Sequence, residues 1–307
     1  SQALGPLVLD SVEQHQALTR GTQAAQWVSE SDFAYAYENR AAFDADAYGW
    51  TLRREVGCRP ELIEGPAVQE AEPMAGPNIG LLAMVRSHGH ILNPGAYAGA
   101  LAHVLQQEGG TYLRAEVKDF TLTDGHVTDV MTNEGPLPCD RAVLTAGIWS
   151  KPLMAKLGLK VPLEAERGYH LHFLQPSQMP RQPMMIGKGK FAVNPMSSGL
   201  RCAGTVELGG ITKGPSRAPL HLIRKYTKWA FPDLDFADVE EWMGFRPSTP
   251  DSLPLIGEVG ATGVYACFGH QHIGLTAGPK TGRWVADMIS DRHPNTDMAP
   301  YDANRFG

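Results

Sequence analysis

The sequence predicts a mixed α/β protein with two lobes, and three observations carry this prediction. A buried strand, a glycine turn and a helix follow one another at residues 264–290. A helix, a β-meander and a short buried strand form one unit at residues 94–146, whereas residues 161–245 are rich in strand-like stretches. We therefore expect a lobe with a partly parallel sheet and a lobe with an antiparallel sheet. Their predicted ranges are 88–160 with 246–307, and 1–87 with 161–245, respectively.

The first third of the chain is predicted to contain several helices within an α+β lobe. Apolar residues at roughly helical intervals predict an opening helix at residues 7–30, and another helix is expected at residues 65–70. Asn93 is a suitable N-cap and Pro94 suits the first helical position, which predicts a helix that ends before Gly109.

Alternating residues after this helix predict a β-meander. Strands are expected at residues 111–115, 117–123 and 126–133, with Asp124 and Gly125 forming a hairpin turn between the last two. A short apolar run then predicts a buried strand at residues 141–146, ended by a turn at Gly147.

The second half of the chain is predicted to alternate between strands and helices. Strands are expected at residues 168–173, 191–195, 200–207 and 264–268. Helices are expected around residues 220–229 and 275–290, and Gly269 stands between the last strand and the last helix.

Composition excludes several classes of function. The net charge is −6, with 27 basic and 33 acidic residues spread along the chain, so nucleic acid is not an expected partner. The four cysteines are far apart and form no Cys-x-x-Cys pair, which argues against a zinc ribbon or a disulfide scaffold. Neither a secretory leader nor an apolar run of membrane-spanning length is recognised. The expected location is cytoplasmic, or peripheral on the inner face of the membrane.

The glycine turn at residues 269–274 has a chemical meaning of its own. A strand that leads through such a turn into a helix directs unpaired backbone N–H groups and the positive helix end toward a ligand. Gly269 and Gly274 allow close approach of that ligand because neither has a Cβ. Read alone, the segment is equally consistent with a crossover in which the glycines serve packing.

Two longer segments resemble the C-terminal signature of the D-amino-acid oxidase/dehydrogenase superfamily, which includes glycine oxidase, sarcosine oxidase and D-amino-acid and D-hydroxyproline dehydrogenases. They are residues 246–257 (RPSTPDSLPLIG) and 268–279 (FGHQHIGLTAGP). Residues 145–150 (TAGIWS) resemble the mid-chain flavin motif of the same superfamily. The resemblance implies a two-lobe FAD-dependent oxidoreductase fold with a discontinuous FAD-binding lobe. The implied FAD contacts are Val117, Ala146, Gly147, Trp149, Gly269, His270, Gln271, His272, Ile273 and Gly274.

The same resemblance implies where the substrate binds. Arg246 matches the arginine that grips the substrate α-carboxylate, and a guanidinium holds a carboxylate through two parallel hydrogen bonds. The alternative is a surface or inter-lobe salt bridge. Tyr169 and His170 lie in a segment that resembles a strand of the substrate cavity, and they complete the candidate catalytic set. His270 and His272 either adjust the flavin or simply pack.

The implied reaction is oxidation of a C–N bond next to a carboxylate. The α-hydrogen leaves as hydride to flavin N5, and water hydrolyses the resulting imino acid. No general base is required, because a neutral amine supplies the electron pair. The sequence leaves open whether the substrate is a D-amino acid or a secondary amino acid. It also leaves open whether the electron acceptor is oxygen, a quinone or a protein.

One part of the superfamily pattern is not recognised, namely an opening strand followed by Gly-x-Gly-x-x-Gly and a helix. Residues 187–192 (GKGKFA) match only in part, because Asn194 and Pro195 follow where a helix is needed, and we expect a hairpin there. The dinucleotide-binding unit is then a missing N-terminal segment or a separate chain, or the protein has lost FAD. We favour the first, because the strand at residues 141–146 otherwise exposes an apolar edge.

Two other classes of function compete with the flavoenzyme. His-x-His occurs at His88 and His90, at His170 and His172, and at His270 and His272, and a strand places such a pair on one face, as in some metal-dependent hydrolases. No Asp or Glu follows at a recognisable ligand spacing, so we expect no metal. A truncated or degenerate binding module without catalysis is the other alternative.

Overall fold

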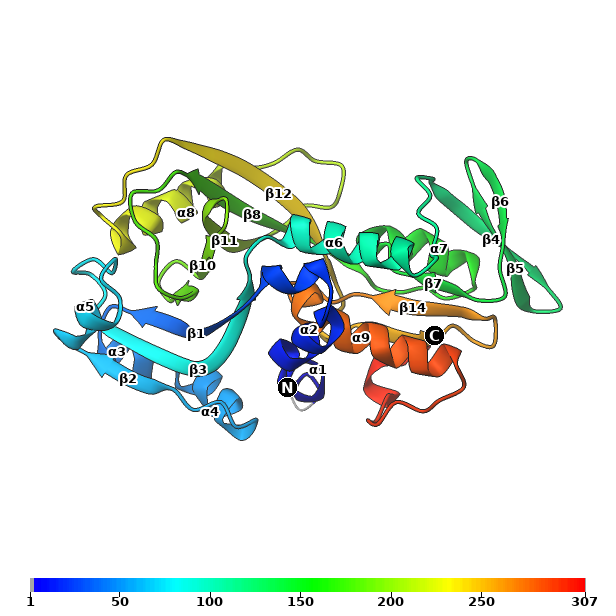
Figure 1. The fold of residues 1–307 in the computed structure, drawn as a ribbon, viewed down its shortest axis with the longest axis horizontal. Helices are drawn as coiled ribbons and strands as arrows, with labels where there is room; N and C mark the ends of the chain where they lie inside the picture. The colour runs from blue at the N-terminus through cyan, green and yellow to red at the C-terminus, as the bar shows by residue number, and fades with distance from the viewer. Residues whose placement is uncertain (1–2, 307) are drawn as a thin grey trace.

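The computed structural model describes residues 3–306, and an eight-stranded sheet forms its larger lobe, which Figure 1 shows beside the smaller one. The strand order is β12-β8-β11-β10-β9-β1-β3-β2. Apart from the parallel pair of β1 and β9, neighbouring strands are antiparallel. The strands are β1 (Val28–Tyr37), β2 (Glu61–Glu64), β3 (Leu81–Ile91), β8 (Glu164–Leu174), β9 (Met184–Ile186), β10 (Phe191–Met196), β11 (Gly199–Leu208) and β12 (Asp238–Ser248).

The alternation of side chains along these strands divides the sheet into two faces. On one face, buried residues such as Tyr169, Leu171 and Phe173 of β8 pack against Leu220 and Ile223 of α8 (Arg217–Ala230). The opposite face carries His170 and Trp242, and it borders the smaller lobe. Three short helices accompany the sheet, namely α3 (Arg40–Asp44), α4 (Ala47–Glu55) and α5 (Ala67–Ala71).

The smaller lobe contains a three-stranded sheet with the order β13-β14-β7. β7 (Ala142–Leu144) runs parallel to β14 (Val264–Phe268), and β13 (Leu255–Glu258) is antiparallel to β14. Tyr265 of β14 packs against α9 (Gly274–Ile289), whereas Ala266 and Phe268 pack with residues of η2 (Gly147–Trp149) and α7 (Ser150–Lys156).

Further elements lie beside these two sheets. A second sheet contains β4 (Val117–Thr123), β5 (His126–Thr132) and β6 (Gly135–Pro138), and α6 (Pro94–Gln107) precedes it. The first helices of the chain, α1 (Gly5–Val8) and α2 (Ser11–Thr19), lie near α9 (Figure 1). The 3-10 helices η1 (Gln23–Trp27) and η3 (Ala299–Tyr301) stand near the two ends of the described chain.

Most of the elements predicted from the sequence are confirmed. The Asn93 side chain accepts a hydrogen bond from the N–H of Ala96 and Pro94 opens α6, as its sequence indicated. Asp124 and Gly125 adopt positive φ in the turn between β4 and β5. Residues 187–190 connect the antiparallel strands β9 and β10, so the partial glycine motif is a hairpin.

Two predicted elements are wrong. The opening helix does not reach residue 30, because α2 ends at Thr19 and residues from Val28 onward pair with β3. Residues 111–115 form no strand, and their apolar side chains Tyr112 and Leu113 are exposed. A strand needs a partner for its backbone hydrogen bonds, and tertiary pairing decides where one is available.

Candidate active site

A cavity of about 530 Å³ lies against the sheet face that carries His170 and Trp242. Its lining comes from β8 to β12 and from Gln271 and His272, in the loop that joins β14 to α9. Strands of the larger lobe and a loop of the smaller lobe therefore form its walls together. The cavity gathers Arg246, Tyr169, His170, Gln271 and His272, all of which the sequence had singled out.

Arg246 occupies this cavity with donors left free. It lies on β12 opposite Glu166 of β8. Its Nη1 donates to the carbonyl of Thr205 at 2.7 Å, and its Nη2 lies 3.5 Å from the carbonyl of Gly204. Among residues 3–306, no carboxylate oxygen lies within 4.0 Å of its guanidinium nitrogens. Two neutral carbonyls therefore orient the guanidinium, and its charge is not neutralised by an ion pair.

A glycine beneath Arg246 makes this arrangement possible. A Cβ added to Gly168 would lie 2.4 Å from Arg246 Cζ, so any other residue would displace the guanidinium. Burial lowers the pKa of Arg246 and the nearby Glu166 opposes that shift, yet an arginine stays protonated in the physiological range. Sequence reasoning missed Gly168. A glycine inside a strand is a recognised signal of close approach, and it could have been used.

An aromatic pair forms the neighbouring wall. The rings of His170 and Trp242 stack with their centroids 4.9 Å apart and an interplanar angle of 16°. Burial lowers the pKa of His170 to about 4, and the positive charge of Arg201 adds to the effect. His170 is consequently neutral near pH 7. The wall next to Arg246 therefore presents apolar and aromatic surface rather than charge.

Tyr169 points away from this wall. Its hydroxyl donates to Glu207 Oε2 at 2.5 Å and accepts from the N–H of Ser216 at 3.0 Å, and its ring lies in the core beneath α8. Tyr169 borders the cavity between Gly168 and His170, but its side chain extends to the face of β8 opposite that of His170. The catalytic role of Tyr169 stays a prediction, and its hydroxyl is already engaged by Glu207 and Ser216.

The two flavin-like motifs follow the carboxyl ends of β7 and β14, which lie side by side in the smaller sheet. In the parallel pair, Leu144 of β7 lies opposite Ala266 of β14, so the segments that follow these strands emerge on the same side. One segment contains Ala146, Gly147 and Trp149, and the other contains residues 269–274. Trp149 is 57% exposed, and its ring meets that of Phe245 edge-on at 6.1 Å. Phe245 precedes Arg246, so the mid-chain motif lies next to the cavity wall.

The backbone at this edge leaves room for a ligand. Gly147 and Gly269 have φ values of 58° and 86°, in the region that favours glycine, and a Cβ added to Gly147 would meet nothing within 4 Å. α9 begins at Gly274 with neither a side-chain cap nor an acidic residue in its first turn. Its first N–H groups and its positive end suit an electron-rich group such as the N1–O2 edge of a flavin. The residues present therefore fit FAD.

Other predicted contacts lie further from the cavity. His270 is largely buried, its Nε2 lies 3.1 Å from Thr281 Oγ1 of α9, and burial lowers its pKa to about 4. His272 lines the cavity, and burial together with Arg246 lowers its pKa. Ile273 stands at the N-cap of α9. Val117 begins β4 in the separate three-stranded sheet, outside the cavity, and is 39% exposed.

The histidine pairs of the sequence do not assemble a metal centre in the described part of the chain. Among residues 3–306, no group of three or more His, Cys, Asp or Glu side chains is arranged to hold a metal ion. His170 stacks on Trp242, and His172 Nε2 lies 3.2 Å from the carbonyl of Ser198. Separately, none of the helices among these residues combines the length and hydropathy needed to cross a bilayer.

An arginine with free donors beside two glycine loops and an uncapped helix start suits an enzyme that holds a substrate carboxylate next to an electron-rich cofactor edge. The family model described as FAD dependent oxidoreductase matches residues 2–288. The chain belongs to this family. It is therefore an oxidoreductase with FAD as its cofactor, and its activity class is FAD-dependent oxidation of amino acids.

Related sequences and structures agree with this membership. The D-amino-acid oxidase of Bradyrhizobium diazoefficiens is 35% identical over 310 residues, which cover 99% of this chain and 73% of the relative. The glycine oxidase of Pseudomonas putida is 28% identical over 84% of this chain and 71% of its own length. The glycine oxidase of Geobacillus kaustophilus has a similar fold, with a TM-score of 0.86 at 22% identity over 99% of this chain and 84% of that one.

Proposed function

We propose that the enzyme oxidises the bond between the α-carbon and nitrogen of a D-amino acid or a secondary amino acid. The observation that carries this proposal is the charge of Arg246. It lies in a cavity beside the two glycine loops, it is oriented by carbonyls, and no carboxylate among residues 3–306 pairs with it. A substrate α-carboxylate would satisfy its free donors in the bidentate way that guanidinium groups favour. The name of one relative, D-amino-acid oxidase, agrees with such a substrate.

The residues of the chain supply binding and environment. Arg246 holds the carboxylate, and the aromatic pair of His170 and Trp242 borders the rest of the substrate. Neutral His170 adds no charge that would compete for the carboxylate or the amine. FAD, when bound, supplies the acceptor for the hydride that leaves the α-carbon. Positioning and a low-polarity environment are then the contribution of the protein, and no acid–base pair is required.

We propose further that two groups of residues contact the cofactor. Ala146, Gly147, Trp149 and residues 269–274 would border the flavin ring, which is supported by the common edge of β7 and β14. Val117 would lie at the adenine end, as the family resemblance implies. The lobe ranges 1–87 with 161–245, and 88–160 with 246–307, belong to the same proposal.

The remaining part of the cofactor site is proposed to come from an additional strand beside β7. In the described chain β7 is the last strand of its sheet, and Val143 on it is 42% exposed. A parallel strand of a dinucleotide-binding unit would cover this edge, whether it belongs to the same polypeptide or to a separate chain.

Replacement of Arg246 by Leu in the full-length flavoprotein tests the substrate proposal. A charge-assisted hydrogen bond contributes about 1.5–3 kcal/mol, so kcat/KM for the amino acid should fall tenfold or more. The matched control is Arg217→Leu, because Arg217 is an exposed arginine of α8, and its kinetics should be unchanged. Equal KM values for Arg246→Leu and the parent enzyme would refute the carboxylate clamp. A colourless protein with metal-dependent hydrolysis would refute the oxidation itself.

A further inference from the structure

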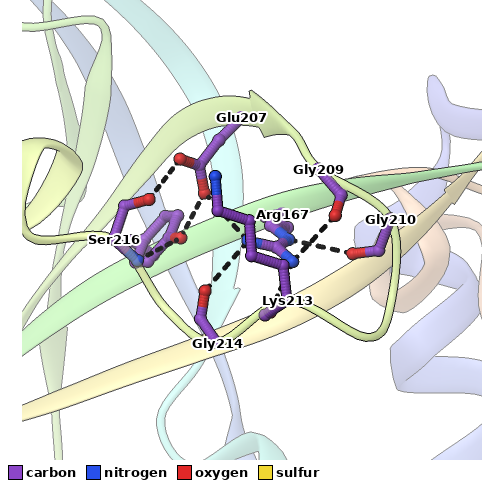
Figure 2. A network of polar contacts seen from close by, with 8 residues as sticks. Arg167, Glu207, Gly209, Gly210, Lys213, Gly214 and Ser216 are labelled. Carbon is purple, nitrogen blue, oxygen red and sulfur yellow. Dashed lines mark hydrogen bonds and ion pairs between the residues drawn. The ribbon is translucent and has the colours of Figure 1, made fainter.

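A second arginine, Arg167 of β8, is fully buried and surrounded by backbone carbonyls (Figure 2). Its Nε donates to the carbonyl of Gly210 at 2.9 Å, and Nη1 donates to that of Gly214 at 3.0 Å. Its Nη2 donates to the carbonyls of Gly209, at 2.9 Å, and Lys213. A buried charge is costly unless all its donors are satisfied. Arg167 therefore depends on the carbonyls of the loop at residues 209–214, and these carbonyls in turn accept their hydrogen bonds from Arg167.

An acidic residue closes the network around the same loop. Glu207 Oε2 lies 3.4 Å from Arg167 Nη1 and accepts from the Tyr169 hydroxyl. Its other carboxylate oxygen accepts from the hydroxyl of Ser216, the N-cap of α8 (Figure 2). These hydrogen bonds hold the pKa of Glu207 below its usual range. The loop of residues 209–216 is therefore fixed to β8 at both of its ends.

The segment just before this loop is the one that orients Arg246. The pairing of β11 with β8 is irregular between Gly204 and Glu207, and Thr205 has a φ of 60°, which is unfavourable for a β-branched residue. The carbonyl of Thr205 accepts from Arg246, whereas Glu207, two residues later, is held by Arg167. A strained bulge of this kind persists only where its surroundings fix it.

We propose that Arg167 is a positioning residue for the carboxylate site. It holds the loop and Glu207, which keep the bulge at Thr205 in place, and the bulge in turn orients Arg246. Arg167 itself touches no substrate, because its donors are occupied by the protein on the opposite side of β8 from His170. This inference rests on the proposed role of Arg246 as the carboxylate clamp.

Replacement of Arg167 by Lys tests the inference, because Lys retains the charge but lacks the planar fork that meets several carbonyls at once. In the FAD-loaded full-length enzyme, the KM for a carboxylate-bearing amino acid should rise about tenfold, with kcat changed by less than about threefold. The Kd of benzoate, a simple carboxylate, should rise in parallel and can be read from the flavin absorption spectrum. Binding of benzylamine, which has no carboxylate, should be unchanged.

Two further variants keep the outcome decisive. Glu207→Gln leaves Arg167 in place and weakens the same network, so it should shift benzoate affinity in the same direction by about threefold even if Arg167→Lys fails to fold. The matched control is Arg217→Lys, because Arg217 is an exposed arginine that forms an ion pair with Glu241. This variant should bind benzoate normally. The inference is overturned if Arg167→Lys or Glu207→Gln loses stability or kcat while KM and benzoate affinity stay normal. If Arg246→Leu also binds benzoate normally, the proposed function fails; if Arg246→Leu alone is impaired, only the inference about Arg167 fails.

Discussion

Burial lowers the pKa of several histidines in this protein, and His270 is the clearest case. It lies between the end of β14 and α9, with Thr281 as its side-chain partner. Burial lowers its pKa from an ordinary 6.5 to about 4. His15, His170 and His172 are shifted in the same direction by the same cause. The folded protein consequently prefers neutral histidines.

This preference predicts how stability depends on pH. Between pH 6.5 and about 4 the unfolded chain binds protons at His270 that the folded chain does not, so the free energy of unfolding falls as pH falls through this window. A shift of this size corresponds to at most about 3 kcal/mol. His270→Asn, which retains a hydrogen-bonding side chain without a titratable ring, should lose less stability between pH 7 and pH 4.5 in urea unfolding. Parallel pH profiles for the two proteins would contradict the prediction.

Among the elements, three helices are joined through one buried histidine. His15 of α2 lies 2.7 Å from the Tyr97 hydroxyl of α6 through Nδ1 and 3.0 Å from the carbonyl of Leu275 in α9 through Nε2. A carbonyl can only accept, so Nε2 carries the proton and Nδ1 accepts from Tyr97. The start of α9, which faces the proposed flavin site, is thereby tied to two helices from the first third of the chain.

Removal of the Tyr97 hydroxyl should show how much the hydrogen bond between His15 and Tyr97 contributes to the stability of the fold. Tyr97→Phe leaves the Nδ1 atom of His15 buried without a donor, which costs about 1–3 kcal/mol. Thermal unfolding should report a lower Tm for this variant. Tyr48 of α4 is 78% exposed, so Tyr48→Phe is the matched control and should unfold like the parent protein. A Tm for Tyr97→Phe equal to that of the control would show that the hydroxyl contributes nothing.

At the scale of the whole molecule, β7 forms one open edge of the sheet β13-β14-β7. The N–H of Ala142 donates to the carbonyl of Gly263, beside β14. Successive residues of a parallel strand direct their N–H groups to alternate sides, so the N–H of Val143 points to the free edge. The amides of Ala142 and Leu144 should therefore exchange slowly with deuterium, and that of Val143 rapidly.

The same experiment tests the proposed additional strand. In a protein that contains the dinucleotide-binding unit, the Val143 amide should become protected, because a neighbouring strand accepts its hydrogen bond. NMR-detected hydrogen exchange should be measured for residues 1–307 alone and for a protein that also contains the dinucleotide-binding unit. The exchange rate of the Val143 amide is then compared between them, with the Leu144 amide as the internal reference. Rapid exchange of Val143 in both proteins would mean that β7 remains an edge strand and that the unit docks elsewhere.

Much of this protein could be predicted from its sequence because the signals are local. The Asn93–Pro94 start of α6, the Asp124–Gly125 turn and the strand–glycine–helix order around Gly269 each depend on neighbouring residues. Arg246 and the loop at Gly147 are recognisable for a different reason, namely the resemblance of residues 246–257 and 145–150 to the superfamily motifs. Both of the wrongly predicted elements, the end of the opening helix and the strand at residues 111–115, rest on side-chain periodicity alone, without a cap or turn residue.

The sequence by itself determined the family resemblance, most of the order of the elements and the position of Arg246 before the last flavin-like strand, whereas the structure decided that Arg246 has no carboxylate partner among residues 3–306. Only the tertiary structure decided that Tyr169 faces the core, that Gly168 lies beneath Arg246, and that Arg167 fixes the loop of residues 209–216. These facts depend on the register of β8 with β11 and β12, whose residues are tens of positions apart in the chain. A shift of one residue in that register would reverse the face of every side chain, and no local pattern specifies it.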